Sequence, residues 1–248
     1  MAILHRLKQH LSALQPYLKC LLCDETTESK QLPICTDCES ELPWLRGHCT
    51  VCALPLPGTG LICGDCQRQP PLFEKVVVPW LYSFPIDSMI IRFKHHAQWP
   101  LGRLLGDLLG HHVQHSFDQG LARADLLLPV PLTERRHRQR GFNQAQMLAS
   151  SLSQHLHIPV KNHCLSRIIE APAQQALDAV TRKKNLCKAF QVAPHAAVKG
   201  LHLALVDDVL TTGATAQSLS RQLLKAGASR VDVYCLARTP KPGTQLDL

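Results

Sequence analysis

One segment near the C-terminus restricts the possible folds more than any other part of this 248-residue chain. An apolar run, Leu201–Val206, leads into the adjacent carboxylates Asp207 and Asp208, then into a loop rich in Thr and Gly. Backbone amides and Thr hydroxyls at the start of a helix can hold a phosphate dianion, assisted by the helix dipole. Carboxylates accept hydrogen bonds from vicinal hydroxyls, such as those of a ribose. The segment therefore predicts a phosphate site with a sugar site beside it.

The whole C-terminal part alternates strand-like and helix-like segments. The predicted strands are Val76–Tyr82, Asp125–Val130, Leu201–Val206 and Val231–Leu236. The predicted helices are Pro85–His96, Pro100–His115, Asn143–Leu156 and Thr215–Ala226. Strands that alternate with helices form a parallel sheet covered on both faces. We therefore expect an α/β domain over residues 71–248, beginning near Pro70-Pro71, and a small cysteine-rich module over residues 1–70.

The loop after the two carboxylates resembles a known motif. An apolar strand, two acidic residues and a TTG-type loop resemble the phosphoribosyl-diphosphate (PRPP) motif of type I phosphoribosyltransferases. The resemblance implies that Asp207 and Asp208 bind the ribose 2′- and 3′-hydroxyls, directly or through Mg²⁺. It also implies that the 5′-phosphate is bound by the loop residues Thr211, Thr212, Gly213, Ala214 and Thr215.

A basic loop gives a second signal. After the strand Asp125–Val130, five cationic or titratable residues gather: Arg135, Arg136, His137, Arg138 and Arg140. A basic loop at the carboxyl end of a strand is well placed for a diphosphate, and guanidinium groups bind its oxygens in a bidentate fork. The residues PVPL and RQRGFNQ around this loop resemble the ComF/GntX family of competence-associated, phosphoribosyltransferase-like proteins.

This second resemblance covers nearly the whole chain, residues 17–240, and includes an N-terminal double zinc ribbon. It implies that Arg140, Asn143 and Gln144 lie near the diphosphate and that Lys94 makes a second phosphate contact. Gln174 and Arg182 would lie on the loop that closes over PRPP. If the protein is a pentosyl-transferring enzyme, the catalytic residues implied are Asp207, Asp208, Arg140 and Lys94.

Eight of the eleven cysteines form four CxxC pairs: Cys20/Cys23, Cys35/Cys38, Cys49/Cys52 and Cys63/Cys66. Two CxxC turns complete a tetrahedral sulfur site, so eight thiolates suit two structural zinc ions. Sequential pairing of the turns is the simplest arrangement, and a cross-braced pairing would use the same residues. Iron–sulfur ligation and redox thiols are the alternatives to zinc. A segment this small depends on its metal for stability.

The N-terminus carries neither a secretory signal nor the ~18 apolar residues of a membrane span. Ile3, Leu4, Leu7, Leu11 and Leu14 recur at helical spacing and predict a short amphipathic helix. A net charge of +8 favours anionic partners. We expect a cytoplasmic protein that has no membrane span.

Three functions fit these features. The first is a phosphoribosyltransferase, in which Mg²⁺ and cationic side chains stabilise the departing diphosphate. The second follows from the ComF resemblance, which implies a role in natural transformation: a PRPP-fold protein that handles single-stranded DNA, with competence proteins such as a DNA-uptake helicase as partners. The third is a sensor that binds PRPP or a nucleotide without turnover.

Overall fold

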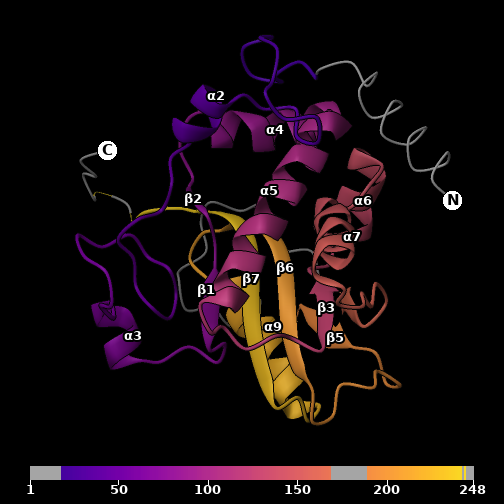
Figure 1. Cartoon of the computed structure of the whole chain (residues 1–248). Helices are drawn as coiled ribbons and strands as arrows, with labels where there is room; N and C mark the ends of the chain where they lie inside the picture. Colours follow the sequence, from indigo (N-terminus) through magenta and orange to yellow (C-terminus); the bar gives the residue numbers. More distant parts are fainter. Residues whose placement is uncertain (1–17, 169–188, 242, 244–248) are drawn as a thin grey trace, which may run out of the picture. The chain divides into compact units, whose positions relative to one another are not determined.

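The computed structural model of the chain describes residues 18–168, 189–241 and 243 (Figure 1). The predicted N-terminal helix lies outside these residues, as do Gln174 and Arg182. The chain forms two compact units, residues 1–42 and 43–248. The boundary between them falls inside the predicted cysteine module, so the second cysteine quartet belongs to the same unit as the sheet.

The second unit is built on a parallel sheet with strand order β1–β7–β6–β3, and β2 also pairs with β7. The strands are β1 (Lys75–Val77), β2 (Trp80–Leu81), β3 (Leu126–Pro129), β6 (His202–Leu210) and β7 (Arg230–Arg238). The sheet and its flanking helices confirm the α/β fold predicted from the alternating pattern. Strands β4 (Leu165–Arg167) and β5 (Phe190–Val192) form a separate antiparallel pair. Each strand is too short for its apolar residues to show the alternation that predicts a strand.

Two predicted strands have different bounds in the structure. The run Val76–Tyr82 is divided into β1 and β2, and the division includes Pro79, which has no N–H to donate to a ladder. Strand β6 does not end at Val206 but continues through Leu210 beside β7. Asp207 and Asp208 therefore lie within the strand, on adjacent positions that point to opposite faces of the sheet.

The helices of the second unit are α4 (Ile86–His96), α5 (Trp99–Asp118), α6 (Glu134–Arg140), α7 (Gln144–Leu156) and α9 (Ala214–Lys225). The prediction of a basic loop after β3 was wrong, because Arg135–Arg140 lie in helix α6. The Thr133 side chain caps this helix by accepting a hydrogen bond from the Arg136 amide at 3.3 Å. The first unit contains the short helix α2 (Thr36–Ser40), and α3 (Gly64–Arg68) belongs to the second cysteine quartet.

Alternating side chains of β6 fill the core on both faces of the sheet. Leu203 and Leu205 pack in one buried cluster with Leu219 and Leu223 of α9. Helices α5 and α7 cover the opposite face (Figure 1). A Cβ on Gly106 of α5 would lie 2.8 Å from the Ser151 side chain, so this glycine permits the close packing of α5 against α7. The sheet is thus held rigidly between layers, with its carboxyl edge open for a site.

Candidate phosphate site and cysteine centres

The eight module cysteines form two separate groups of four. Cys20, Cys23, Cys35 and Cys38 gather in the first unit, and Cys49, Cys52, Cys63 and Cys66 gather in the second, with all ligand sulfurs of each group within 4.8 Å of one another. Four thiolates about 2.3 Å from a tetrahedral zinc ion lie about 3.8 Å apart. The sulfurs of Cys23 and Cys35 are 3.7 Å apart, and those of Cys52 and Cys63 are 3.6 Å apart. The geometry fits two structural zinc ions and confirms the sequential pairing.

Backbone amides prepare one thiol of each group to bind metal. Burial raises the pKa of Cys49, but hydrogen bonds from nearby backbone N–H groups outweigh that effect and lower the pKa to about 7. The Cys63 amide donates to the Cys49 sulfur at 3.3 Å. Cys20 has the same environment, and its pKa is also lowered to about 7. These thiols give up their protons readily, as metal binding requires.

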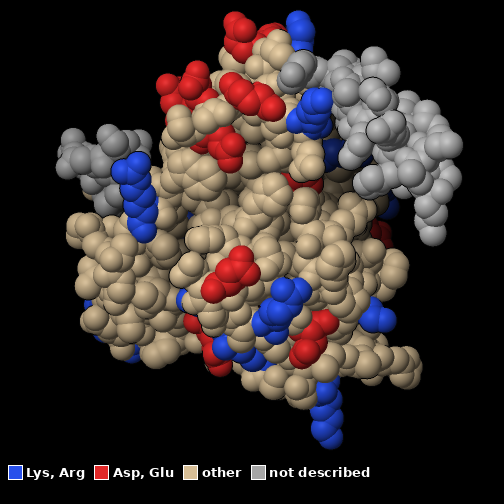
Figure 2. Space-filling model, in the orientation of Figure 1, with Lys and Arg blue, Asp and Glu red and all other residues tan. Residues whose placement is uncertain are grey.

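The first unit carries a strongly acidic surface. Residues 18–42 contain six acidic side chains (Asp24, Glu25, Glu28, Asp37, Glu39 and Glu41) and two lysines, for a net charge of −4. Figure 2 shows acidic side chains gathered on the part of the molecule that carries α2 in Figure 1. A surface of this sign repels a nucleic-acid backbone, so we place no DNA contact on residues 18–42.

The predicted phosphate loop joins β6 to α9. Thr211, Thr212 and Gly213 form the turn, and Ala214 and Thr215 begin the helix. Gly213 has φ +75°, a left-handed conformation that glycine adopts without strain, and it is the N-cap of α9. The first amides of α9 therefore face the end of the sheet, where a helix N-terminus attracts an anion.

The acid pair lies beside two cations from distant parts of the chain. The Lys94 Nζ of α4 is 2.8 Å from Asp208 Oδ2, and both side chains are largely buried. The Arg140 guanidinium at the end of α6 is close enough to interact electrostatically with both carboxylates. It also donates a hydrogen bond to Gln144 Oε1 at 3.0 Å. The fold thus brings together Asp207, Asp208, Lys94, Arg140 and Gln144, and the ligand-binding roles of these residues stay predictions.

The ionisation of Asp207 depends on its burial and on its neighbour Asp208. Burial, followed by the negative charge of Asp208, raises the pKa of Asp207 to about 7. Lys94 lies against Asp208 and compensates its charge directly. Near neutral pH, Asp207 can therefore exchange its proton for a ligand that prefers a carboxylate, whether a hydroxyl donor or a hard divalent cation.

The Asn143 side chain forms hydrogen bonds with backbone groups. Its side chain accepts a hydrogen bond from the Ala145 amide at 2.9 Å and caps α7. It also donates to the Val130 carbonyl at 3.1 Å, and the residue is only 5% exposed. Asn143 thereby holds the carboxyl end of β3 against the start of α7, and a direct role at the diphosphate stays a prediction.

Arg238 is the site residue that sequence reasoning missed. It ends β7 opposite Leu210, next to the phosphate loop, and is 6% exposed. Its Nη1 donates to the carbonyls of Leu210, Thr211 and Thr239. The only sequence signal is a cation directly after an apolar strand, VDVYCLAR, which also fits an ordinary exposed strand end.

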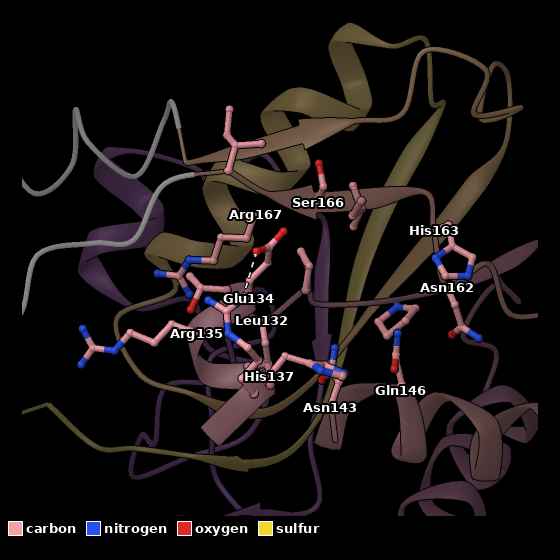
Figure 3. A pocket seen from close by; sticks show the side chains of 16 residues that line it. Leu132, Glu134, Arg135, His137, Asn143, Gln146, Asn162, His163, Ser166 and Arg167 are labelled. Atoms are coloured by element: carbon pink, nitrogen blue, oxygen red, sulfur yellow. Dashed lines mark ion pairs between the residues drawn. The ribbon is translucent and has the colours of Figure 1, made fainter. Parts of the chain in front are cut away.

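A cavity of about 820 Å³ opens between α6 and β4. Figure 3 shows Arg135 and His137 reaching it from α6, with Ser166 and Arg167 on the β4 side. A second cavity of about 910 Å³ shares His137, Asn143, Gln146 and Asn162 with the first. The two cavities adjoin at these four residues and are together called the groove; the sequence did not reveal it because its walls come from separate helices and strands.

The structure defines a protein with two Cys₄ centres and a parallel α/β domain that carries an acid pair before a helix-opening TTG loop. A family model described as a double zinc ribbon domain matches residues 11–67. The DNA utilization protein YhgH of Escherichia coli (strain K12) is 34% identical over 221 residues, covering 89% of this chain and 96% of that protein. Competence protein F of Haemophilus influenzae is 35% identical over 216 residues, covering 84% and 86%. The chain therefore belongs to the ComF family.

More distant proteins are also similar. Competence protein ComFC of Bacillus subtilis is 24% identical over 241 residues, covering 90% of this chain and 95% of that protein. Among solved structures, a purine phosphoribosyltransferase from Pyrococcus horikoshii is 17% identical with a TM-score of 0.37, covering 58% of this chain and 79% of that one. No helix among the residues that the structure describes is both long and apolar enough to cross a membrane.

Proposed function

We propose that this chain binds PRPP together with Mg²⁺ and acts on the cytoplasmic side in natural transformation and DNA uptake. The observation that carries the proposal is the Lys94–Asp208 ion pair beside Asp207, at the edge where the TTG loop opens α9. Ribose hydroxyls would bind the carboxylates, and the 5′-phosphate would bind the first amides of α9. The relatives named for competence and for DNA utilization support the biological role.

Each side chain then has a defined task. Asp207 and Asp208 supply oxygen ligands of the kind that Mg²⁺ prefers, and the bound ion would neutralise charge on the diphosphate. Arg140 and Lys94 are two cations beside the acid pair, and they would attract the diphosphate to the same edge of the sheet. If the ribose is transferred to a nitrogen nucleophile, these two cations would stabilise the departing diphosphate.

Calorimetric titration of PRPP with Mg²⁺ tests this proposal. Wild-type protein is expected to bind saturably, and the double substitution Asp207→Ala/Asp208→Ala is expected to reduce the affinity at least about 100-fold, because both sugar and ion contacts are lost. Asp118→Asn, which removes a carboxylate at the far end of α5, should leave binding unchanged. A folded, zinc-loaded wild type that does not bind PRPP would overturn the proposal. Product assays with candidate bases then separate an enzyme from a sensor.

A second function, binding of single-stranded DNA, is favoured by the groove that the two adjoining cavities form. Arg135, Arg138 and Arg167 line its first cavity and would attract phosphates. Phe142 lines the second cavity and contacts Trp99, with ring centroids 4.5 Å apart and ring planes tilted by 48°; Trp99 is 47% exposed. Cations and aromatic side chains at one groove are the elements of a single-strand site.

Charge reversal on α6 tests the groove. Arg135→Glu/Arg138→Glu is expected to weaken the binding of a fluorescent oligodeoxynucleotide at least about tenfold and to reduce the slope of log K against log salt by roughly 1.4. The control Lys199→Glu/Lys225→Glu makes the same change in net charge at exposed sites elsewhere. Equal effects of the two variants on anisotropy titrations would mean that only the net charge of the protein matters, which contradicts a site in the groove.

A further inference from the structure

The guanidinium of Arg238 lies between two sites that are distant in the sequence. Its Nε donates to the Cys52 carbonyl at 3.0 Å, across 186 residues of chain. Its Nη1 donates to the Leu210 carbonyl at 3.0 Å and to the Thr239 carbonyl at 2.8 Å. Cys52 is a ligand of the second cysteine centre, and Leu210 leads into the phosphate loop. One buried side chain therefore joins the backbones of both sites.

The bonding pattern of Arg238 indicates a positioning role. A buried guanidinium requires compensation, and among the described contacts its hydrogen-bond acceptors are all backbone carbonyls. Carbonyls held in this way cannot turn toward a bound phosphate. The loop amides and the first turn of α9 then keep the orientation that an anion needs.

A second contact links the same two regions independently of Arg238. The chain that leaves Cys66 passes the start of α9, where the Leu72 amide donates to Gln217 Oε1 at 2.8 Å. A Cβ built on Gly213 would lie 3.8 Å from the buried Phe73 ring, so that ring packs beside the N-cap of α9. The chain that follows the second cysteine centre thus contacts the start of α9 directly, besides the link through Arg238.

We propose that Arg238 is a positioning residue that couples the second cysteine centre to the phosphate loop, so that metal at the one and a phosphorylated sugar at the other stabilise each other. The ligand half of this coupling rests on the proposed function. Thermodynamic linkage makes the effect reciprocal: a bound sugar phosphate strengthens metal binding, and a bound metal strengthens sugar-phosphate binding by the same factor. The first cysteine centre lies in the other unit and serves as an internal reference.

The test compares two arginines of the same strand. Arg238→Gln removes the coupling, whereas Arg230→Gln alters the opposite end of β7, where Arg230 pairs with Asp232 and Glu74. Arg238→Lys keeps the charge with fewer donors and should show an intermediate effect. Amide hydrogen exchange of the peptide spanning residues 209–215 reports loop order without any ligand, and Arg238→Gln should accelerate it at least about tenfold. Equal exchange in wild type and Arg238→Gln would overturn the proposal.

The coupling itself is measured as the rate of zinc release, followed with a metallochromic indicator, with and without ribose 5-phosphate as the ligand. A Cys20→Ser/Cys23→Ser variant removes the first centre and assigns the release phases. Saturating ribose 5-phosphate should slow release from the second centre about fivefold or more in wild type and in Arg230→Gln, but not in Arg238→Gln. Slowing that persists in Arg238→Gln contradicts the coupling. If wild type binds neither ribose 5-phosphate nor PRPP, the proposed function fails, and hydrogen exchange alone decides the role of Arg238.

Discussion

Replacing Lys94 with Met is expected to weaken binding of PRPP with Mg²⁺ by about 100-fold or more at neutral pH. Lys94 and Asp208 form a buried ion pair, and removing one partner of such a pair leaves an uncompensated charge at a cost of about 3–5 kcal/mol. Because Lys94 also lowers the pKa of Asp207, its loss favours the protonated form of Asp207. A protonated carboxyl no longer accepts a hydroxyl hydrogen bond in the same way and does not hold a divalent cation.

The pKa of Asp207 determines how the affinity for PRPP should change with pH. In wild type the pKa of Asp207 is raised to about 7 by burial and by the charge of Asp208, so affinity should decrease as the pH falls below 7. The Lys94 charge lowers the pKa of Asp207, so without it Asp207 holds its proton to higher pH. The acidic limb of the Lys94→Met profile should therefore move upward, and raising the pH should restore part of the affinity.

Calorimetry between pH 6 and pH 9 measures both effects. The matched control is Lys161→Met, which removes an exposed lysine outside the acid pair and should bind as wild type does. Circular dichroism and zinc content show whether each variant is folded. A Lys94→Met protein that binds normally at pH 7, or whose loss of affinity is the same at every pH, would contradict the role assigned to this ion pair.

Loss of the second metal centre is expected to destabilise the α/β domain, whereas loss of the first centre should not. A structural zinc ion contributes about 10–16 kcal/mol of apparent binding free energy in small zinc peptides, and that energy is available for folding. Cys52 packs against the core cluster that contains β6 and α9, and the Val76 amide of β1 donates to the Val51 carbonyl at 2.9 Å. The second centre is therefore part of the sheet domain, and the first is not.

Differential scanning calorimetry of Cys49→Ser and Cys20→Ser measures this difference. Cys49→Ser should lower the Tm of the main transition by at least about 10 °C, because a loss of only a few kcal/mol shifts a domain of this size by that amount. Cys20→Ser should leave the main transition in place and release one zinc ion per chain. Equal shifts in the two variants would contradict the division of the chain into these two units.

The sequence by itself determined the features that depend on local pattern. The spacing of apolar residues and the length of each segment predicted the parallel α/β fold, because buried strands and amphipathic helices differ in both. The CxxC spacing identified all eight metal ligands, because two thiolates separated by two residues converge on one centre. The order of strand, Asp207, Asp208 and TTG loop indicated the proposed phosphate site, because those residues are neighbours along the chain.

Only the tertiary structure decided which distant residues meet. Lys94 reaches Asp208 because α4 packs near the end of β6, and no pattern within α4 distinguishes that lysine from a solvent-exposed one. Arg238 donates a hydrogen bond to the Cys52 carbonyl across 186 residues of chain. This contact depends on how β7 and the cysteine segment pack together. The basic residues after β3 form a helix because Thr133 caps it, and the groove beside that helix needs β4 as its second wall. Contacts of this kind depend on how elements pack, which sequence spacing does not record.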